Sequence, residues 1–303
     1  MSDRPWHIDK HRVRQSFDAA ARAYDEAAVL QHEVRGRLLE RLDYMKIEPA
    51  RVLDAGTGTG RAADALLRRY PKAQVISLDL AYGMLQIARR RGRWRRRPLP
   101  VNADIEALPF ADGSFDLIFS NLTLQWVEDI DRVFAELRRV LAPRGLLLFT
   151  SFGPDTLREL RDAWSRVDDH PHVNAFLDMH DVGDALVRSG FADPVMDMEM
   201  LTVTYPQARQ LMRDLKRIGA GNALRERARG MTGKSRLQAV EAAYEAYRTG
   251  QGLLPASYEV VYGHAWAPEA PPPSSGAGGR SIGIPVRVQP VSSGNKGREG
   301  ETD

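Results

Sequence analysis

Hydrophobic and polar positions follow two alternating periods in the middle of the chain. Short apolar runs of strand length recur between about 51 and 151, and most precede a segment with apolar residues at helical spacing. We predict strands at 51–55, 74–80, 98–104, 115–121 and 145–151, and helices at 61–70, 82–91 and 129–141. Strands that alternate with helices at this length imply a doubly wound, parallel α/β sheet, which binds ligands at the carboxyl ends of its strands.

The same patterns extend the fold on both sides of this region. Apolar positions at helical spacing between 10 and 43 break near Tyr24, so we predict two helices here, the first ending at Tyr24. Beyond 151 we predict helices at 154–167, 179–188, 206–217 and 234–248, and strands at 195–204 and 257–266. The expected architecture is therefore a mostly parallel, seven-stranded sheet. An N-terminal helical cover precedes it, and a helical insert separates its last two strands.

The end of the chain departs from these patterns. Residues after Trp266 are rich in Pro, Gly and Ser and poor in large apolar side chains, so we predict a disordered tail over 268–303. The apolar stretch IGIPVRVQPV within it is a candidate docking segment. One domain then spans 1–267, and its parts are the N-terminal helices at 10–43, the ligand-binding core at 51–152 and a helical insert or lid at 206–250.

Composition and charge narrow the class of protein. The absence of cysteine excludes disulfides, thiolate metal sites and cysteine nucleophiles. The N-terminus lacks the apolar core of a signal peptide and no apolar run reaches ~18 residues, so we expect a cytoplasmic protein without a membrane segment. The net charge is only +3, yet seven arginines gather at 89–97. This basic patch is either a contact for an anionic partner or a solvated loop.

The stretch VLDAGTGTG, at 52–60, carries the strongest chemical signal. It predicts a buried strand that breaks into a turn at Gly56, Gly58 and Gly60, where a ligand can approach the backbone and the following helix. The spacing fits neither the dinucleotide motif nor the phosphate loop, and no lysine follows. Asp54 would repel phosphates and attract an ammonium group. We infer a ligand that joins a nucleoside to an amino acid.

Two further aspartates end predicted strands on the same face. Asp79 follows Gly60 by nineteen residues, the spacing at which a carboxylate accepts both hydroxyls of a ribose. Asp104 ends the third strand, where it either accepts from an exocyclic amine beside Ile105 or caps the turn that begins there. Together with Asp54, these carboxylates define a site along the carboxyl edge of the sheet.

These segments resemble the motif series of class I S-adenosylmethionine-dependent methyltransferases, which have a Rossmann-like sheet with an antiparallel last strand. The resemblance covers roughly 51–152 and rests on DAGTGTG, SLDL, NADIEALPF, FDLIFSNLTLQW and LAPRGLLLFTSF. It implies that the cofactor is bound by Asp54, Gly56, Gly58, Gly60, Asp79, Leu80, Met84, Asp104, Ile105 and Asn121. In that family the glycine loop holds the methionine part, Met84 covers one adenine face, and Asn121 lies near the sulfonium.

The flanking segments are similar to those of the malonyl-acyl carrier protein O-methyltransferases of biotin synthesis. They are VRQSFDAAARAYDEAAVLQHEV, LMRDLKRIGAGNA, GMTGKSRL and SYEVVYGHAW, in the same order and approximate spacing. The resemblance implies methylation of the free carboxylate of a malonyl thioester, giving the methyl ester that primes pimeloyl synthesis for biotin. We expect the arginine-rich stretch at 89–97 to dock the acidic carrier protein, and we expect no membrane or nucleic-acid partner.

A carboxylate acceptor is ionised at neutral pH, so its methylation needs alignment and exclusion of water rather than a general base. Tyr24 is our candidate catalytic and substrate-binding residue, because its hydroxyl would donate to the malonyl carboxylate; alternatively, its ring only anchors the N-terminal helix. Arg213 and Lys216 are candidates to orient the anion, unless they are solvated helix positions. Trp126 either walls the substrate pocket or belongs to the core.

Two other features bear on the choice of function. His170 and His172 have no third ligand nearby, so we interpret them as surface-loop residues and predict no metal site. The signature of amine-methylating nucleic-acid enzymes is absent, since Ser-Asn-Leu-Thr stands at 120–123. A methyltransferase for another small molecule or for RNA, and a cofactor-binding assembly protein without catalysis, remain the alternatives.

Overall fold

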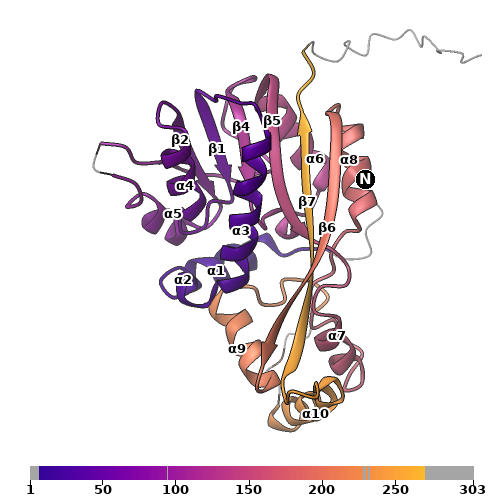
Figure 1. Cartoon of the computed structure of the whole chain (residues 1–303). Coiled ribbons are helices and arrows are strands. Elements are labelled where there is room, and N and C mark those ends of the chain that lie inside the picture. The colour runs from indigo at the N-terminus through magenta and orange to yellow at the C-terminus, as the bar shows by residue number, and fades with distance from the viewer. Residues whose placement is uncertain (1–6, 94, 228–229, 231–232, 270–303) are drawn as a thin grey trace, which may run out of the picture. The chain divides into compact units, whose positions relative to one another are not determined.

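A seven-stranded sheet with the order β3-β2-β1-β4-β5-β7-β6 forms the centre of the fold (Figure 1). The computed structural model describes residues 7–93, 95–227, 230 and 233–269, which lie within one compact unit. The strands are β1 Arg51–Ala55, β2 Gln74–Asp79, β3 Leu99–Asn102, β4 Phe115–Ser120, β5 Leu141–Phe152, β6 Ala192–Tyr205 and β7 Leu254–Trp266. Strands β1 to β5 pair in parallel, whereas β7 runs antiparallel to both β5 and β6. The predicted Rossmann-like architecture is confirmed, including its antiparallel last strand.

Each predicted helix overlaps a helix of the structure. The helices are α1 Lys10–Ala20, α2 Tyr24–Ala27, α3 Val29–Arg41, α4 Arg61–Arg69, α5 Tyr82–Ala88, α6 Ile130–Val140, α7 Arg158–Ser165, α8 Met179–Arg188, α9 Ala208–Arg217 and α10 Lys234–Tyr244. Short 3-10 turns follow or connect them, namely η1 Leu42–Tyr44, η2 Leu124–Trp126 and η3 Glu245–Tyr247.

The N-terminal region differs in one respect from its prediction. It holds three helices rather than two, and Tyr24 begins α2 instead of ending the first helix. The turn before α2 directs the Asp25 carboxylate inward, where it accepts a hydrogen bond from Thr59 Oγ1 at 2.6 Å and contacts Arg61 at 3.0 Å. These partners lie far away in the sequence, so helical periodicity predicts a break near Tyr24 but not the short helix α2 that begins there.

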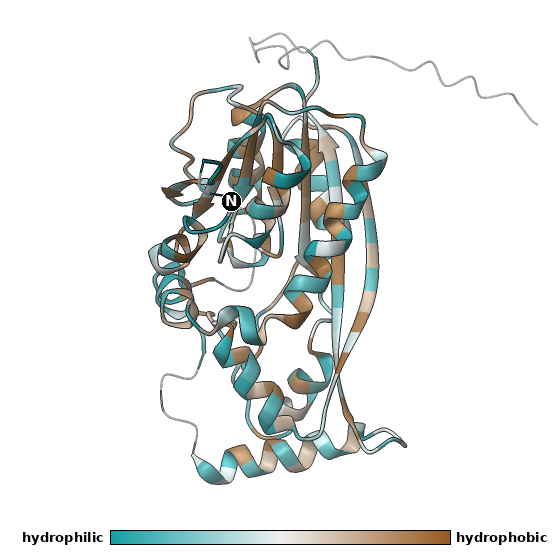
Figure 2. Ribbon diagram, turned by 60° about the vertical axis from the view of Figure 1, so that its left-hand side comes forward, coloured by the Kyte–Doolittle hydropathy of each residue, from teal (hydrophilic) through white to brown (hydrophobic). Residues whose placement is uncertain are grey.

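Apolar side chains bury both faces of the parallel part of the sheet. Val52 and Leu117 pack with Leu66 of α4 on one face, and Leu53 packs with Phe134 of α6 on the other. Figure 2 shows the apolar strands between helices whose outer positions are hydrophilic. This alternation follows from the pleat, because successive side chains of a strand point to opposite faces.

The two antiparallel strands carry the helical insert. Their pairing runs from Ala192 opposite Trp266 to Tyr205 opposite Leu254, and α7, α9 and α10 lie around their far ends (Figure 1). The buried Tyr244 of α10 donates its hydroxyl to the carbonyl of Pro255 at 2.9 Å. The insert is thereby fixed to β7, and α9 leads the chain back toward the N-terminal helices.

Two predictions concern the ends of the chain. In the part that the structure describes, no helix is long and apolar enough to span a bilayer. The predicted tail at 268–303, with its candidate docking segment, lies outside the described residues apart from 268 and 269. The domain boundaries given above therefore stay predictions.

Candidate functional site

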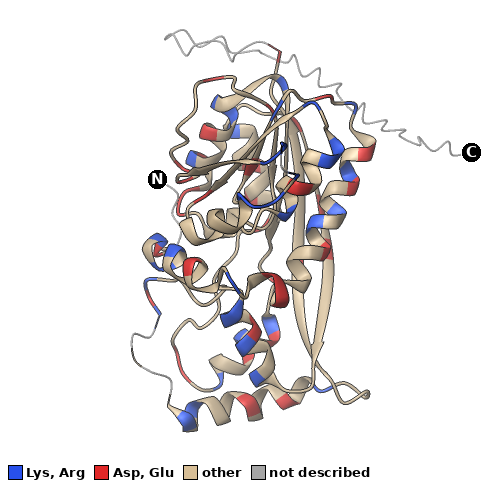
Figure 3. Ribbon diagram, turned by 90° about the vertical axis from the view of Figure 1, so that its left-hand side faces the viewer, with Lys and Arg blue, Asp and Glu red and all other residues tan. Residues whose placement is uncertain are grey.

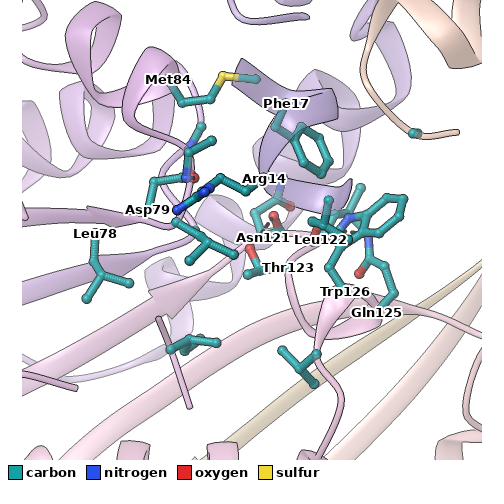
Figure 4. Close-up of a pocket in the computed structure, with 18 of the residues that line it drawn as sticks. Arg14, Phe17, Leu78, Asp79, Met84, Asn121, Leu122, Thr123, Gln125 and Trp126 are labelled. Carbon is teal, nitrogen blue, oxygen red and sulfur yellow. Dashed lines mark hydrogen bonds between the residues drawn. The ribbon is translucent and has the colours of Figure 1, made fainter. Parts of the chain in front are cut away.

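A cavity that is partly open to solvent lies at the carboxyl ends of the central parallel strands. Ligand sites in sheets of this topology occupy that position. Its wall includes Lys10, Arg14, Phe17, Tyr24, Gln31, Gly56, Gly58, Asp79, Leu80, Met84, Asp104, Ile105, Asn121, Thr123, Gln125, Trp126, Phe152, Ile218 and Ala220 (Figure 4). The sheet edge, the N-terminal helices and the segment just past α9 thus meet around one space.

The glycine loop after β1 presents its backbone to this cavity. Gly56 has φ +77°, and a Cβ there would lie 2.0 Å from Thr123 Oγ1, so only glycine fits. Gly58 has φ +54°, lines the cavity, and would meet no atom within 4 Å if it carried a Cβ. The N–H of Gly58 donates to Asp79 Oδ2 at 2.8 Å, which fixes the loop against β2. The open space beside Gly58 is where a ligand can lie on the backbone.

Two of the predicted cofactor-binding residues lie behind the loop instead of on the cavity wall. Asp54 is 1% exposed, and its Oδ2 accepts a hydrogen bond from Thr57 Oγ1 at 2.5 Å. Burial raises the pKa of Asp54 to about 7. Gly60 caps α4 with φ +79°, and a Cβ there would lie 2.7 Å from Ala88. Both residues shape the loop, because the turn passes over the end of β1 and covers them.

Asp79 stands at the end of β2 with both carboxylate oxygens oriented by backbone donors. Its Oδ2 accepts from Gly58 and its Oδ1 accepts from the N–H of Ala81, each at 2.8 Å. Burial raises the pKa of Asp79 to about 6. Each oxygen keeps a second lone pair for an incoming hydroxyl. Figure 4 shows Arg14 of α1 extended across the cavity toward Asp79.

Asp104 both lines the cavity and caps the turn that follows β3, and its contact with an exocyclic amine stays a prediction. Its Oδ1 accepts from the N–H of Glu106 at 3.0 Å, and its Oδ2 accepts from Lys10 Nζ at 2.7 Å. The same ammonium lies 2.8 Å from Glu106 Oε1. Ile105 is buried and adds an apolar surface. Lys10 therefore fastens α1 to the adjoining side of the cavity.

The end of β4 forms the opposite side. Asn121 Oδ1 accepts from Thr150 Oγ1 at 3.1 Å, and Asn121 Nδ2 donates to the carbonyl of Gln31 at 3.3 Å. Trp126 lines the cavity and packs edge-on against Phe17 of α1, with ring centroids 5.3 Å apart. Trp126 therefore walls the pocket and also belongs to a packed cluster. Aromatic rings on this side exclude water from the space between them.

Tyr24 reaches the cavity from the first position of α2. Its hydroxyl forms no hydrogen bond with any residue in the described ranges, although it lies inside a packed region. Burial raises the pKa of Tyr24, and the nearby charges of Asp79 and Asp25 raise it further. The phenol therefore stays neutral at physiological pH and can donate its proton in a hydrogen bond to an anion.

The two basic residues predicted to orient the substrate anion do not line the cavity. Arg213 and Lys216 are exposed on α9, whereas Ile218 and Ala220, just past its end, form part of the wall. The reason is the helical period, because the face of α9 that packs inward carries Ala208 and Leu211 instead. Arg213 and Lys216 therefore lie outside the wall of this cavity, and their predicted role in orienting the anion stays a prediction.

The cations that do line the cavity, Lys10 and Arg14, were missed from the sequence. A basic residue on an amphipathic helix is typical of a solvated face, so no local signal marks them. Arg35 of α3 was missed for the same reason. Its side chain is half-buried and forms no hydrogen bond or ion pair with the described residues. Burial lowers the pKa of Arg35, whereas the nearby charges of Asp25 and Asp54 act to raise it.

The residues around His170 and His172 form a loop, as predicted, but His172 is only partly exposed. His172 stacks on Trp164 with ring centroids 3.6 Å apart, and its Nε2 lies 2.7 Å from Asp168 Oδ1. His170 is exposed. Stacking on a tryptophan is a long-range contact that the spacing of two histidines cannot predict. Over the described ranges, no group of three or more acidic or histidine side chains is arranged to hold a metal ion.

Comparisons with known proteins agree with this geometry. Residues 53–149 match the Methyltransferase domain family. The chain is 56% identical over 260 residues to malonyl-[acyl-carrier protein] O-methyltransferase from Halorhodospira halophila, covering 86% of this chain and 88% of that protein. It is 54% identical to the protein of the same name from Gallionella capsiferriformans, covering 86% of this chain and 92% of that protein.

A solved structure shares the fold at much lower identity. The YcgJ protein from Bacillus subtilis superposes with a TM-score of 0.55 and 16% identity, over 79% of this chain and 100% of that chain. This structural likeness shows the fold alone, whereas the sequence identities above 50% over most of both chains, given above for the two relatives, show membership of one family. On that ground, this chain belongs to the malonyl-[acyl-carrier protein] O-methyltransferase family.

Proposed function

We propose that this protein transfers a methyl group from S-adenosylmethionine to the free carboxylate of a malonyl thioester on an acyl-carrier protein. The product is the methyl ester that primes pimeloyl synthesis for biotin. The observation that carries the proposal is the free, neutral hydroxyl of Tyr24, which shares one cavity with the glycine loop and Asp79. The names of the relatives supply the substrate and the carrier.

The cavity fits the cofactor at both of its ends. Gly58 leaves open space against the backbone for the methionine part, and the oriented oxygens of Asp79 suit the ribose hydroxyls. Met84 and Ile105 offer apolar surface for the adenine, and Asp104 offers an acceptor for its amine. When bound, S-adenosylmethionine supplies an electrophilic methyl group on its sulfonium.

The residues around the proposed position of the malonyl carboxylate support methyl transfer without a general base. Malonyl carboxylate is the nucleophile, and it is ionised at neutral pH because an ordinary carboxyl pKa is about 4. Tyr24 donates a hydrogen bond to this anion and aligns it, while Phe17, Trp126 and Phe152 remove water from its surroundings. Ile218 and Ala220 of the insert line this side of the cavity, which supports the proposal that the insert acts as a lid.

The test is to incubate the protein with S-adenosylmethionine and malonyl-carrier protein and to follow the carrier by mass spectrometry. We expect the malonyl carrier to gain one methyl group. Acetyl-carrier protein is the matched control, because it has no free carboxylate and should gain none. Cofactor binding without an ester would favour the non-catalytic alternative, and methylation of both carriers would point to another acceptor group.

The biological part of the proposal has its own test. Expression of the protein should restore growth without biotin in a bacterial strain that lacks the malonyl-methylating step. We expect the protein to act in the cytoplasm, where that step takes place in such a strain. Docking of an acidic carrier on the arginine-rich stretch at 89–97 stays a prediction of the sequence.

A further inference from the structure

We propose that an acidic surface of the carrier protein docks on the outer face of α9 and the adjoining end of α1. Arg213 and Lys216 are the exposed cations of α9 that form no ion pair with a described residue, and Arg22 is an exposed cation two residues past the end of α1; we call these three residues the rim patch. The inference rests on the proposed function, because it concerns the protein that carries the thioester. It gives Arg213 and Lys216 a role outside the cavity.

The rim patch lies next to the cavity that would receive the thioester. Lys216 stands two residues before Ile218, which lines the cavity, as Ala220 does on the other side of Gly219. The chain turns at Gly219, where a Cβ would lie 3.0 Å from the carbonyl oxygen of Ser16 in α1. The end of α9 is therefore packed on α1 at the edge of the cavity.

The charges of α9 divide into anchored and free residues. Arg209 binds Glu241 at 2.6 Å, and Arg217 binds Glu26 of α2 at 2.9 Å, so both hold the helix in place. Arg213 and Lys216 are three positions apart on the same face, and neither forms a hydrogen bond or ion pair with a described residue. The side chains of Arg213 and Lys216 are therefore available to bind a partner protein.

The arginine-rich stretch at 89–97 is placed less favourably for docking a substrate. None of its described residues lines the cavity. Arg91 donates to the carbonyl of Thr59 at 3.0 Å, and Arg96 donates to the carbonyl of Leu67 at 2.8 Å, so these two arginines fasten the loop along α4. Figure 3 shows the basic residues of this loop and those of α9 at separate places on the ribbon.

The rim patch favours an acidic protein over the other anionic partners. A membrane-binding helix needs an apolar face turned outward, whereas the apolar face of α9 is buried through Ala208 and Leu211. A nucleic-acid site that contacts about 6–10 phosphates needs more cations than the three of the rim patch. A few charges at the edge of a cavity instead steer an oppositely charged protein to it.

The experiment compares two charge reversals on two substrates. The double variant Arg213→Glu/Lys216→Glu reverses the rim patch, and Arg93→Glu/Arg97→Glu makes the same change in charge on the arginine loop. Each is assayed with malonyl-carrier protein and with malonyl-pantetheine, which lacks the protein. We expect the rim variant to lower kcat/KM for the carrier substrate about 10-fold or more, mostly through KM. Malonyl-pantetheine should react at the wild-type rate, and the loop variant should match wild type on both substrates.

Three outcomes would overturn the docking proposal. They are an unchanged rim variant, equal losses on both substrates, and a larger loss in the loop variant. If the wild-type protein methylated neither substrate, the proposed function would fail, and titration of the unloaded carrier protein against wild type and rim variant would still decide the docking. Weaker binding by the rim variant supports the proposal, and equal binding refutes it.

Discussion

The hydroxyl of Tyr24 can be removed without disturbing the packing of its ring. Tyr24→Phe keeps the contact with Phe17, whose ring centroid is 6.4 Å away, and deletes only the donor that we assign to the malonyl carboxylate. Hydrogen bonds to charged groups contribute about 1.5–3 kcal/mol, so we expect methyl transfer to fall roughly 10- to 100-fold. Single-turnover measurements with malonyl-carrier protein would record the loss.

Cofactor affinity separates this role from a structural one. Calorimetric titration with S-adenosylmethionine should give nearly the same dissociation constant for the variant and the wild type. Unchanged turnover would reduce Tyr24 to an aromatic anchor of α2. Weakened cofactor binding would instead assign its hydroxyl to the methionine part of the cofactor.

The residues of the site differ in how well the sequence revealed them. Asp79, Asp104 and the glycine loop could be predicted, because strand ends and turns are local signals and the sheet brings them to one edge. The position of Asp54 behind the loop could not, since it depends on the hydrogen bond with Thr57. Nor could the entry of Arg14 into the cavity, which follows from the packing of α1 over the sheet edge.

Helix α1 could be predicted from the sequence, but its position over the cavity could not. Its residues lie about 90 positions from Asp104, and their apolar spacing predicts a helix without saying what the helix covers. The structure joins α1 to this carboxylate through Lys10, and it also pairs Ile8 with Leu224 of the segment that follows α9. Elements are thus predictable from periodicity, whereas their closure over a site depends on contacts between distant segments.

Fastening by Lys10 predicts an effect on the exchange of the cofactor. Lys10→Met removes the ammonium that bridges Asp104 and Glu106 but keeps a long side chain on α1. Partly exposed ion pairs contribute up to about 1 kcal/mol, so α1 should open more often and cofactor dissociation should accelerate by up to roughly fivefold. Stopped-flow fluorescence of Trp126, which lines the cavity, would follow the dissociation.

The control for this change is Gln15→Ala, on the exposed side of the same helix. It alters α1 without touching the ion pair, and the cofactor should leave it at the wild-type rate. If both variants released the cofactor equally fast, the stability of α1 would matter rather than its attachment to Asp104. If neither differed from wild type, α1 would not limit the exit of the cofactor.

At the scale of the whole molecule, the site is built around carboxylates that the fold buries. Burial raises the pKa of Asp79 to about 6, whereas an unfolded aspartate titrates near 4. Between these values the folded protein holds a proton that the unfolded chain has lost. The stability from this proton is fully present below about pH 4 and is lost as the pH rises through about 6. Ligand-free protein therefore gives up some of its stability at the pH where it works.

Replacement of the Asp79 carboxylate tests whether its ionisation lowers the stability of the fold. Asp79→Asn cannot ionise, and it also loses one of two backbone hydrogen bonds, a cost that does not depend on pH. In ligand-free protein, the melting temperature of the wild type should fall relative to that of Asp79→Asn as the pH rises from about 4.5 to 8. Asp169→Asn, at an exposed position, is the control for the loss of an aspartate carboxylate. A constant difference for Asp79→Asn would mean that the ionised carboxylate of Asp79 does not lower the stability of the fold.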